Sequence, residues 1–128
     1  MRLVRDPVFG EVDITASADE LTRLAGAVAD GEGLLSASDN PEGDVLAGLE
    51  VRKSSGPGVL VRLDPERRIL VISGDSAGRA VLAGNLRDVA SAEEGLHLHI
   101  DYFPGHYYLA EGSESLVVSS PHGGMPGR

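Results

Sequence analysis

The chain has 128 residues and no cysteine, and its 20 acidic and 11 basic residues give it a formal net charge of −9. Without cysteine it can form neither disulfides nor thiolate metal sites. Its negative field repels nucleic acids and anionic membrane surfaces. No stretch approaches the roughly 18 apolar residues that span a bilayer, and the N-terminus lacks the apolar run of a signal peptide, so we expect a cytoplasmic protein.

The first half of the sequence predicts a strand, a helix and a series of hairpin strands. Residues 11–15 alternate between polar and apolar side chains, as a half-buried strand does. A helix should follow, because Ser17 and Glu20 have the spacing of a capping box and apolar residues then recur at helical spacing until Gly31. Alternating or continuous apolar runs predict further strands at 34–38, 47–51, 59–63 and 69–73.

The second half predicts another helix and a C-terminal group of strands. Ser76 is in position to cap this helix, and Leu82, Leu86 and Val89 mark its buried stripe. Strand-like runs follow the helix at 96–103, 107–110 and 115–119. The last residues, 120–128, are rich in glycine and proline and have the composition of a disordered tail.

The order of these elements predicts an α+β fold. Most of the strands are joined by hairpin-length connections, which favours a mostly antiparallel sheet with the two helices packed on one face. No repeat of about 20–50 residues and no interdomain linker is visible. We therefore expect a single α+β domain over residues 1–119, followed by the disordered tail at 120–128.

The densest group of polar side chains lies in the strand predicted at 96–103. There His97, His99 and Asp101 project from one face, and His106 follows after a Pro-Gly turn. Side chains spaced in this way along one strand lie too far apart to chelate a metal by themselves, so we expect no bound metal and no cofactor. The alternative is a small metal-binding protein or metal-dependent enzyme that uses this strand face.

Four of the five aromatic residues of the chain flank the same Pro-Gly turn. Tyrosine at such a place is a rigid anchor for a protein interface, because it offers a large contact area at a low cost in side-chain entropy. The candidate partner-binding residues are therefore His97, His99, Asp101, His106 and Tyr107.

The sequence offers no complete catalytic set. Gly74-Asp75-Ser76 resembles the opening motif of the GDSL-type hydrolases, but the chain contains no Asp-x-x-His to supply the base. A phosphate-binding loop is also absent, because no Gly-Lys-Ser/Thr occurs. We therefore expect no catalytic residues and a protein that acts by binding.

The C-terminal half resembles the Imm32-type immunity proteins of bacterial polymorphic toxin systems. The resemblance covers about Ile69 to Ser119 and rests on the turn at 74–76 that opens a helix, the His-x-His strand at 97–101 and the apolar strand at 116–118. It implies an α+β protein of the cytoplasm that binds a cognate toxin.

An acidic chain suits a basic toxin, and its charge would steer the association. We therefore expect a protein partner, and neither nucleic acid nor membrane. A homodimer formed through a sheet edge is a further alternative that the sequence leaves open.

Overall fold

The computed structural model describes residues 1–38, 42–92 and 96–120. In order along the chain the elements are β1 (Arg2–Asp6), β2 (Glu11–Thr15), α1 (Ala18–Asp30), β3 (Glu32–Ser36), β4 (Gly48–Lys53), β5 (Val59–Asp64), β6 (Ile69–Gly74), α2 (Ser76–Ser91), β7 (Leu96–Ile100) and β8 (Ser115–Ser120). The predicted α+β class is confirmed. Neither helix of the described residues is long and apolar enough to cross a membrane.

Some details of the strands differ from the sequence-based expectations. Strand β1 was not predicted, and residues 107–110 form no strand because they belong to a loop that follows the edge of β5. Strand β7 ends at Ile100, short of the predicted limit. The expected tail lies outside the described residues, except that Ser120 ends β8.

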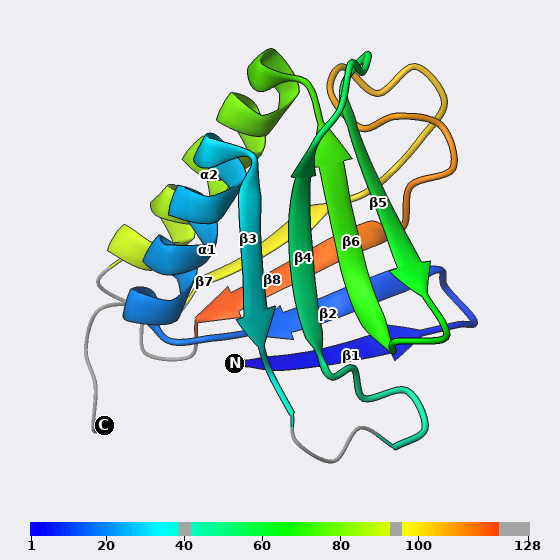
Figure 1. Ribbon diagram of the computed structural model, residues 1–128. Coiled ribbons are helices and arrows are strands. Elements are labelled where there is room, and N and C mark those ends of the chain that lie inside the picture. Colours follow the sequence, from blue (N-terminus) through cyan, green and yellow to red (C-terminus); the bar gives the residue numbers. More distant parts are fainter. Residues whose placement is uncertain (39–41, 93–95, 121–128) are drawn as a thin grey trace.

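The strands form two four-stranded sheets. Sheet A has the order β1-β2-β8-β7 and sheet B the order β3-β4-β6-β5. In each sheet two antiparallel hairpins are joined through a parallel pair of central strands, β2 with β8 and β4 with β6. The sheets are mixed, not antiparallel throughout, because each helix carries the chain from one sheet to the other. Figure 1 shows sheet B crossing in front of sheet A, with the two helices side by side along one flank.

The chain folds as two halves that have the same order of elements. The first half is β1-β2-α1-β3-β4 and the second is β5-β6-α2-β7-β8, and each sheet takes one hairpin from each half. Counterparts from β1 through α1 lie 58 positions apart, and the Leu-Ala-Gly sequence at 24–26 recurs at 82–84. This spacing is longer than the repeat of about 20–50 residues that solenoid and propeller folds show in their sequences.

The first hairpin of each half closes with the same turn. Asp6 and Asp64 end β1 and β5, and the carboxylate of each accepts hydrogen bonds from the backbone amides two and three positions further on. Each turn has proline in its first position and a residue with positive φ in its last, Gly10 at 63° and Arg68 at 55°. The backbone of the two turns is therefore closely similar.

A single cluster of buried side chains fills the space between the sheets and the helices. Helix α1 contributes Leu21, Leu24, Ala25 and Val28, and α2 contributes Leu82, Ala83, Leu86 and Val89. The predicted stripe of α2 is thus confirmed. The strands add aliphatic side chains to the same cluster, among them Ile14, Leu49, Leu70 and Leu116.

Both helices begin at a capping side chain. The capping box predicted for Ser17 and Glu20 is present in α1. In α2 the N-cap is Asp75 and not Ser76, and its Oδ1 accepts a hydrogen bond of 2.8 Å from the Gly78 amide. Its Oδ2 accepts a second hydrogen bond, of 3.0 Å, from the amide of Gly58 in the connection between β4 and β5. These backbone bonds, the second one most, hold the pKa of the Asp75 carboxyl below its usual range.

Arg79 of α2 is charged and yet only 6% exposed. Its Nη1 donates to the carbonyl oxygens of Val28 at 3.1 Å and Ala29 at 2.8 Å, where α1 ends, and its Nε donates to that of Gly74 at 3.0 Å, where β6 ends. A positive charge is favourable at the C-terminal end of a helix, where carbonyl groups lack partners within the helix. Arg79 thus joins both helices to sheet B.

We predict that Arg79→Met lowers the free energy of unfolding by about 2 kcal/mol, because three carbonyl groups, two of them in buried hydrogen bonds, lose their donor. Arg87→Met is the control, since Arg87 lies on the exposed side of the same helix, and it should change the stability by less than about 0.5 kcal/mol. Urea denaturation of the two variants measures both values. Equal losses in both variants would contradict the role given to Arg79.

Candidate functional site

Strand β7 presents its polar side chains on the outer face of sheet A. Its register with β8 pairs His97 with Ser119, and the Nδ1 of His97 lies 2.7 Å from the Ser119 Oγ. His97 and His99 are exposed, as is Asp101 just beyond the strand, whereas Ile100 between them is buried in the core. The polar face predicted from the sequence is therefore present.

The described residues contain no group of three or more His, Asp or Glu side chains arranged to hold a metal ion. His106 lies in the loop after β7, where its ring contacts aromatic rings. Among the candidate residues, His106 and Tyr107 thus contact each other in the loop, whereas His97 and His99 belong to strand β7.

Residues 101–114, the aromatic loop, connect β7 to β8. The His106 ring is the centre of the loop: it stacks on Tyr107 with centroids 5.6 Å apart and an interplanar angle of 6°. It also lies 4.9 Å from the Phe103 ring and meets the Tyr108 ring edge-on at 4.7 Å. Phe103 and Tyr107 are exposed, whereas Tyr108 is buried. The exposed rings of Phe103 and Tyr107 therefore both contact His106, which in turn contacts the buried ring of Tyr108.

The aromatic loop is tied to the edge of β5 by backbone hydrogen bonds. The Val59 amide donates to the Tyr108 carbonyl at 2.6 Å, and the Ala110 amide donates to the Val59 carbonyl at 2.6 Å. Further along, the Glu114 amide donates to the Val61 carbonyl at 2.8 Å. These bonds cover the β5 edge of sheet B and fix the loop in one place.

Hydrogen bonds also fix the side chains beneath the exposed pair. The Nδ1 of His106 accepts from the amides of Tyr108 at 3.2 Å and Leu109 at 3.0 Å, so that this nitrogen is unprotonated. Burial lowers the pKa of His106, which keeps the ring neutral. The Tyr108 hydroxyl accepts from the Asn85 amide group at 3.0 Å, and burial raises the pKa of Tyr108.

A solvent-open hollow of about 400 Å³ lies beside the rings. It is lined by residues of the aromatic loop on one side and by Pro57 and Gly58 on the other. Gly58 has a positive φ of 76°, and a Cβ built there would come within 2.4 Å of the Tyr108 carbonyl oxygen. Glycine is required at this position for the loop to approach so closely.

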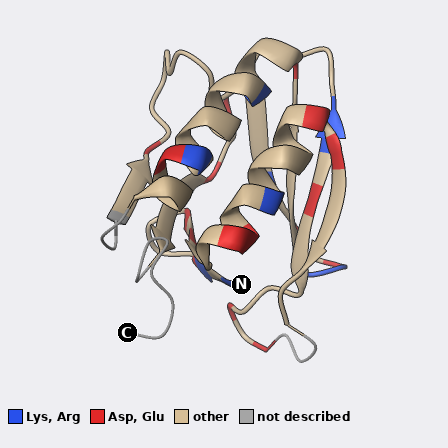
Figure 2. Ribbon diagram, turned by 90° about the vertical axis from the view of Figure 1, so that its left-hand side faces the viewer, with Lys and Arg blue, Asp and Glu red and all other residues tan. Residues whose placement is uncertain are grey.

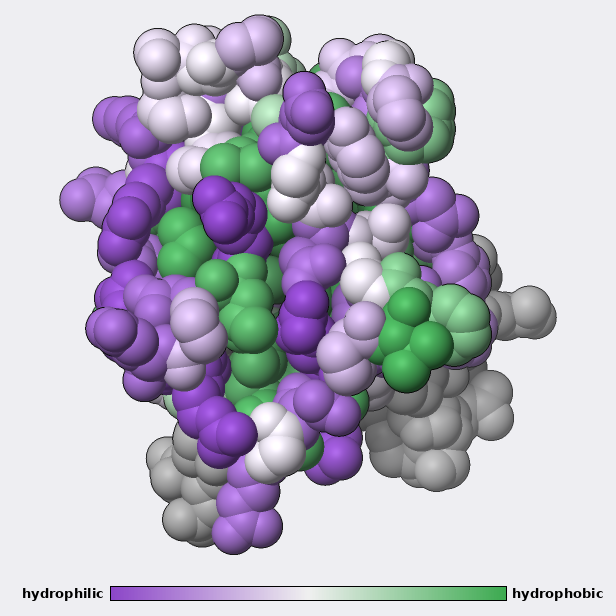
Figure 3. Space-filling model, turned by 90° about the vertical axis from the view of Figure 1, so that its right-hand side faces the viewer, coloured by the Kyte–Doolittle hydropathy of each residue, from purple (hydrophilic) through white to green (hydrophobic). Residues whose placement is uncertain are grey.

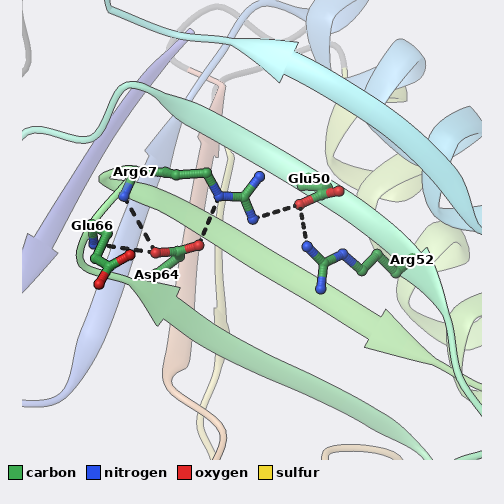
Figure 4. Close-up of polar contacts among 5 residues, drawn as sticks. All are labelled: Glu50, Arg52, Asp64, Glu66 and Arg67. Atoms are coloured by element: carbon green, nitrogen blue, oxygen red, sulfur yellow. Dashed lines mark hydrogen bonds and ion pairs between the residues drawn. The ribbon is translucent and has the colours of Figure 1, made fainter.

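The outer face of sheet B differs from that of sheet A, because charged side chains on it form ion pairs with one another. Figure 4 shows Arg67 between two carboxylates: its Nη2 lies 2.9 Å from the Glu50 Oε1 and its Nε lies 2.8 Å from the Asp64 Oδ2. Arg52 donates to the same Glu50 oxygen at 2.9 Å. Hydrogen bonds from Arg52 and Arg67 lower the pKa of Glu50, and those from Arg67 lower the pKa of Asp64. This face therefore offers little unbalanced charge to a partner.

Comparison with known families gave a match in the C-terminal part of the chain. Residues 69–121 match the family model of Immunity protein 32, Imm32. The resemblance predicted from the sequence is confirmed. Comparisons with curated proteins and with solved structures gave no match.

The Imm32 segment contains β6, α2, β7, the aromatic loop and β8. All five candidate residues predicted from the sequence therefore lie within it. Residues 1–68 lie outside the matched segment, although they supply two strands of sheet A and three strands of sheet B.

Two exposed residues outside the Imm32 segment were not singled out from the sequence. Val8 and Phe9 form the centre of the turn between β1 and β2, and both side chains point into solvent. The signal that could have revealed them is an apolar pair enclosed by Pro7 and Gly10, at a place where hairpin turns usually carry polar residues.

We predict that the aromatic loop loosens in acid. Protonated His106 cannot accept hydrogen bonds from the amides of Tyr108 and Leu109. Because its folded-state pKa lies below the ordinary value of 6.5, this stabilisation is complete above that pH and is lost as the pH falls below it. Hydrogen exchange of the two amides, corrected for intrinsic rates, should therefore speed up between about pH 7.5 and pH 5. The Ile72 amide in β6 is the control, and unchanged protection of all three amides would contradict the prediction.

Proposed function

We propose that this chain is an immunity protein that neutralises a cognate toxin by binding it directly, without catalysis, in the cytoplasm. The observation that carries the proposal is the Imm32 match, because the matched segment includes the outer face of β7 and the whole aromatic loop. A protein of this kind needs an exposed surface that is rigid before its partner arrives.

The aromatic loop meets this requirement. Phe103 and Tyr107 are exposed aromatic side chains, the class most often found at the energetic centre of interfaces. The neutral ring of His106 and the hydrogen bonds to β5 hold them in place, so that little conformational entropy remains to be lost on binding. The hollow beside them gives a partner side chain a place to enter.

The charge of the loop favours a basic toxin. The loop contains Asp101, Glu111 and Glu114 and neither lysine nor arginine. The helices on the opposite flank carry both signs, as Figure 2 shows, with four acidic and three basic residues in α1 and α2 together. The loop therefore carries acidic side chains without a basic residue of its own, and it would attract a positively charged surface.

The test uses, as a purified protein, a candidate toxin whose gene adjoins the gene for this chain. The wild-type chain should bind that toxin and should restore the growth of cells that produce it. Failure of the wild-type chain both to bind and to protect would contradict the proposed function.

Within that test, we predict that Asp101→Lys slows association with the toxin roughly tenfold at low salt, because it reverses a charge beside the loop. Asp88→Lys, on the exposed side of α2, makes the same change in net charge and should slow association less than about twofold. At about 1 M salt, where the screening length is only about 3 Å, the rates of both variants should approach that of the wild type. Stopped-flow kinetics measures these rates, and equal slowing by the two variants would place the interface elsewhere.

A further inference from the structure

We infer that the toxin-binding surface extends into the N-terminal half of the chain: the turn at 7–10 projects Val8 and Phe9 as an apolar knob that enters a pocket on a basic protein surface. The inference rests on the proposed function, and it assigns part of the interface to residues that the Imm32 match does not cover.

The turn and the aromatic loop emerge from the same end of sheet A. Strand β2 pairs in parallel with β8, so that Glu11 lies beside Ser115 where both strands begin. The Ser115 amide donates to the Gly10 carbonyl at 3.0 Å, and Arg5 forms an ion pair with Glu114 of the loop. Two segments about 100 positions apart in the sequence therefore form one continuous surface.

Exposed apolar side chains concentrate at this end of the molecule. The described residues contain five large apolar side chains that are exposed, namely Val8 at 83%, Phe9 at 75%, Leu34 at 73%, Phe103 at 54% and Tyr107 at 78%. All except Leu34 belong to the turn or to the loop. Figure 1 places both segments on the flank opposite the helices, and Figure 3 shows apolar patches between hydrophilic side chains on that flank.

The second half of the chain shows that the fold itself does not require apolar residues in this turn. The counterpart of the turn, residues 65–68, has the same proline, the same aspartate bonds and the same positive φ at its end. At the positions equivalent to Val8 and Phe9 it carries Glu66 and Arg67. The same turn conformation therefore forms with charged side chains. The conformation does not explain why exposed apolar residues occupy positions 8 and 9.

The turn is also rigid, as a binding knob should be. The Asp6 Oδ1 accepts hydrogen bonds from the amides of Val8 at 3.0 Å and Phe9 at 3.3 Å. Because these bonds hold the backbone beneath both side chains, insertion of the pair costs little additional ordering.

The charge around the knob selects a basic partner over other occupants. Residues 5–11 and 101–115 contain five carboxylates and one arginine, Arg5, which is already paired with Glu114. An anionic membrane or a second copy of this acidic chain would be repelled by this border, whereas a basic protein would be attracted.

The test is the double variant Val8→Glu/Phe9→Arg, which copies the counterpart turn and leaves the net charge unchanged. Its urea midpoint should match that of the wild type, because the same residues already occupy the same backbone elsewhere in the chain. Its Kd for the candidate toxin should rise at least about 30-fold, the scale of losing an interface anchor. Leu34→Thr is the control, since it removes an equally exposed apolar side chain from β3, and its Kd should stay within about twofold of wild type.

The outcomes separate the inference from the proposed function. If the wild-type chain binds the toxin and the double variant binds equally well, the inference is wrong and the proposed function stands. If the wild-type chain itself fails to bind, the proposed function fails first. Sedimentation of both proteins tests a second copy as the occupant, and a wild-type dimer that the double variant dissociates would overturn the choice of a toxin.

Discussion

The two parallel strand pairings, β2 with β8 and β4 with β6, are the contacts on which the rest of the structure depends. Each half of the chain supplies two hairpins, and an isolated two-stranded hairpin is at best marginally stable in water. The parallel pairings join hairpins of different halves into four-stranded sheets, and only then do both sheets and both helices enclose one core. Neither half has a complete sheet of its own.

The same pairings create the proposed binding surface. Because β8 runs beside β2, the loop that precedes β8 comes to lie next to the turn that precedes β2. The long loops then cross between the sheets: the aromatic loop bonds to β5 of sheet B, and the Asp44 carbonyl of the other long connection accepts from the Arg5 amide of β1 in sheet A. The edges formed by β1 and β5 are thereby covered, and the aromatic side chains gain a rigid support.

Local patterns in the sequence were sufficient for the elements that depend on local interactions. The capping box at Ser17, the alternation of β2 and the apolar stripe of α2 all appear in the structure as predicted. The division into two sheets was not predictable, because it depends on contacts between distant segments. Residues 107–110 have strand-like composition, but they pack along β5 as a loop, and no periodicity distinguishes the two outcomes. Likewise, the exposure of Phe9 becomes visible only when the position of its turn is known.

The repeated order of elements gives this architecture the symmetry of a dimer. A chain made of one half alone would leave the inner edges of both its hairpins unpaired. Two copies of such a chain would satisfy those edges through the pairings seen here, in a swapped dimer with a two-fold axis between the helices. The present chain has the arrangement that such a dimer would have if its subunits were fused, and its two halves are not bound to have identical surfaces. One turn carries charged residues suited to solvent, and its twin carries exposed apolar ones.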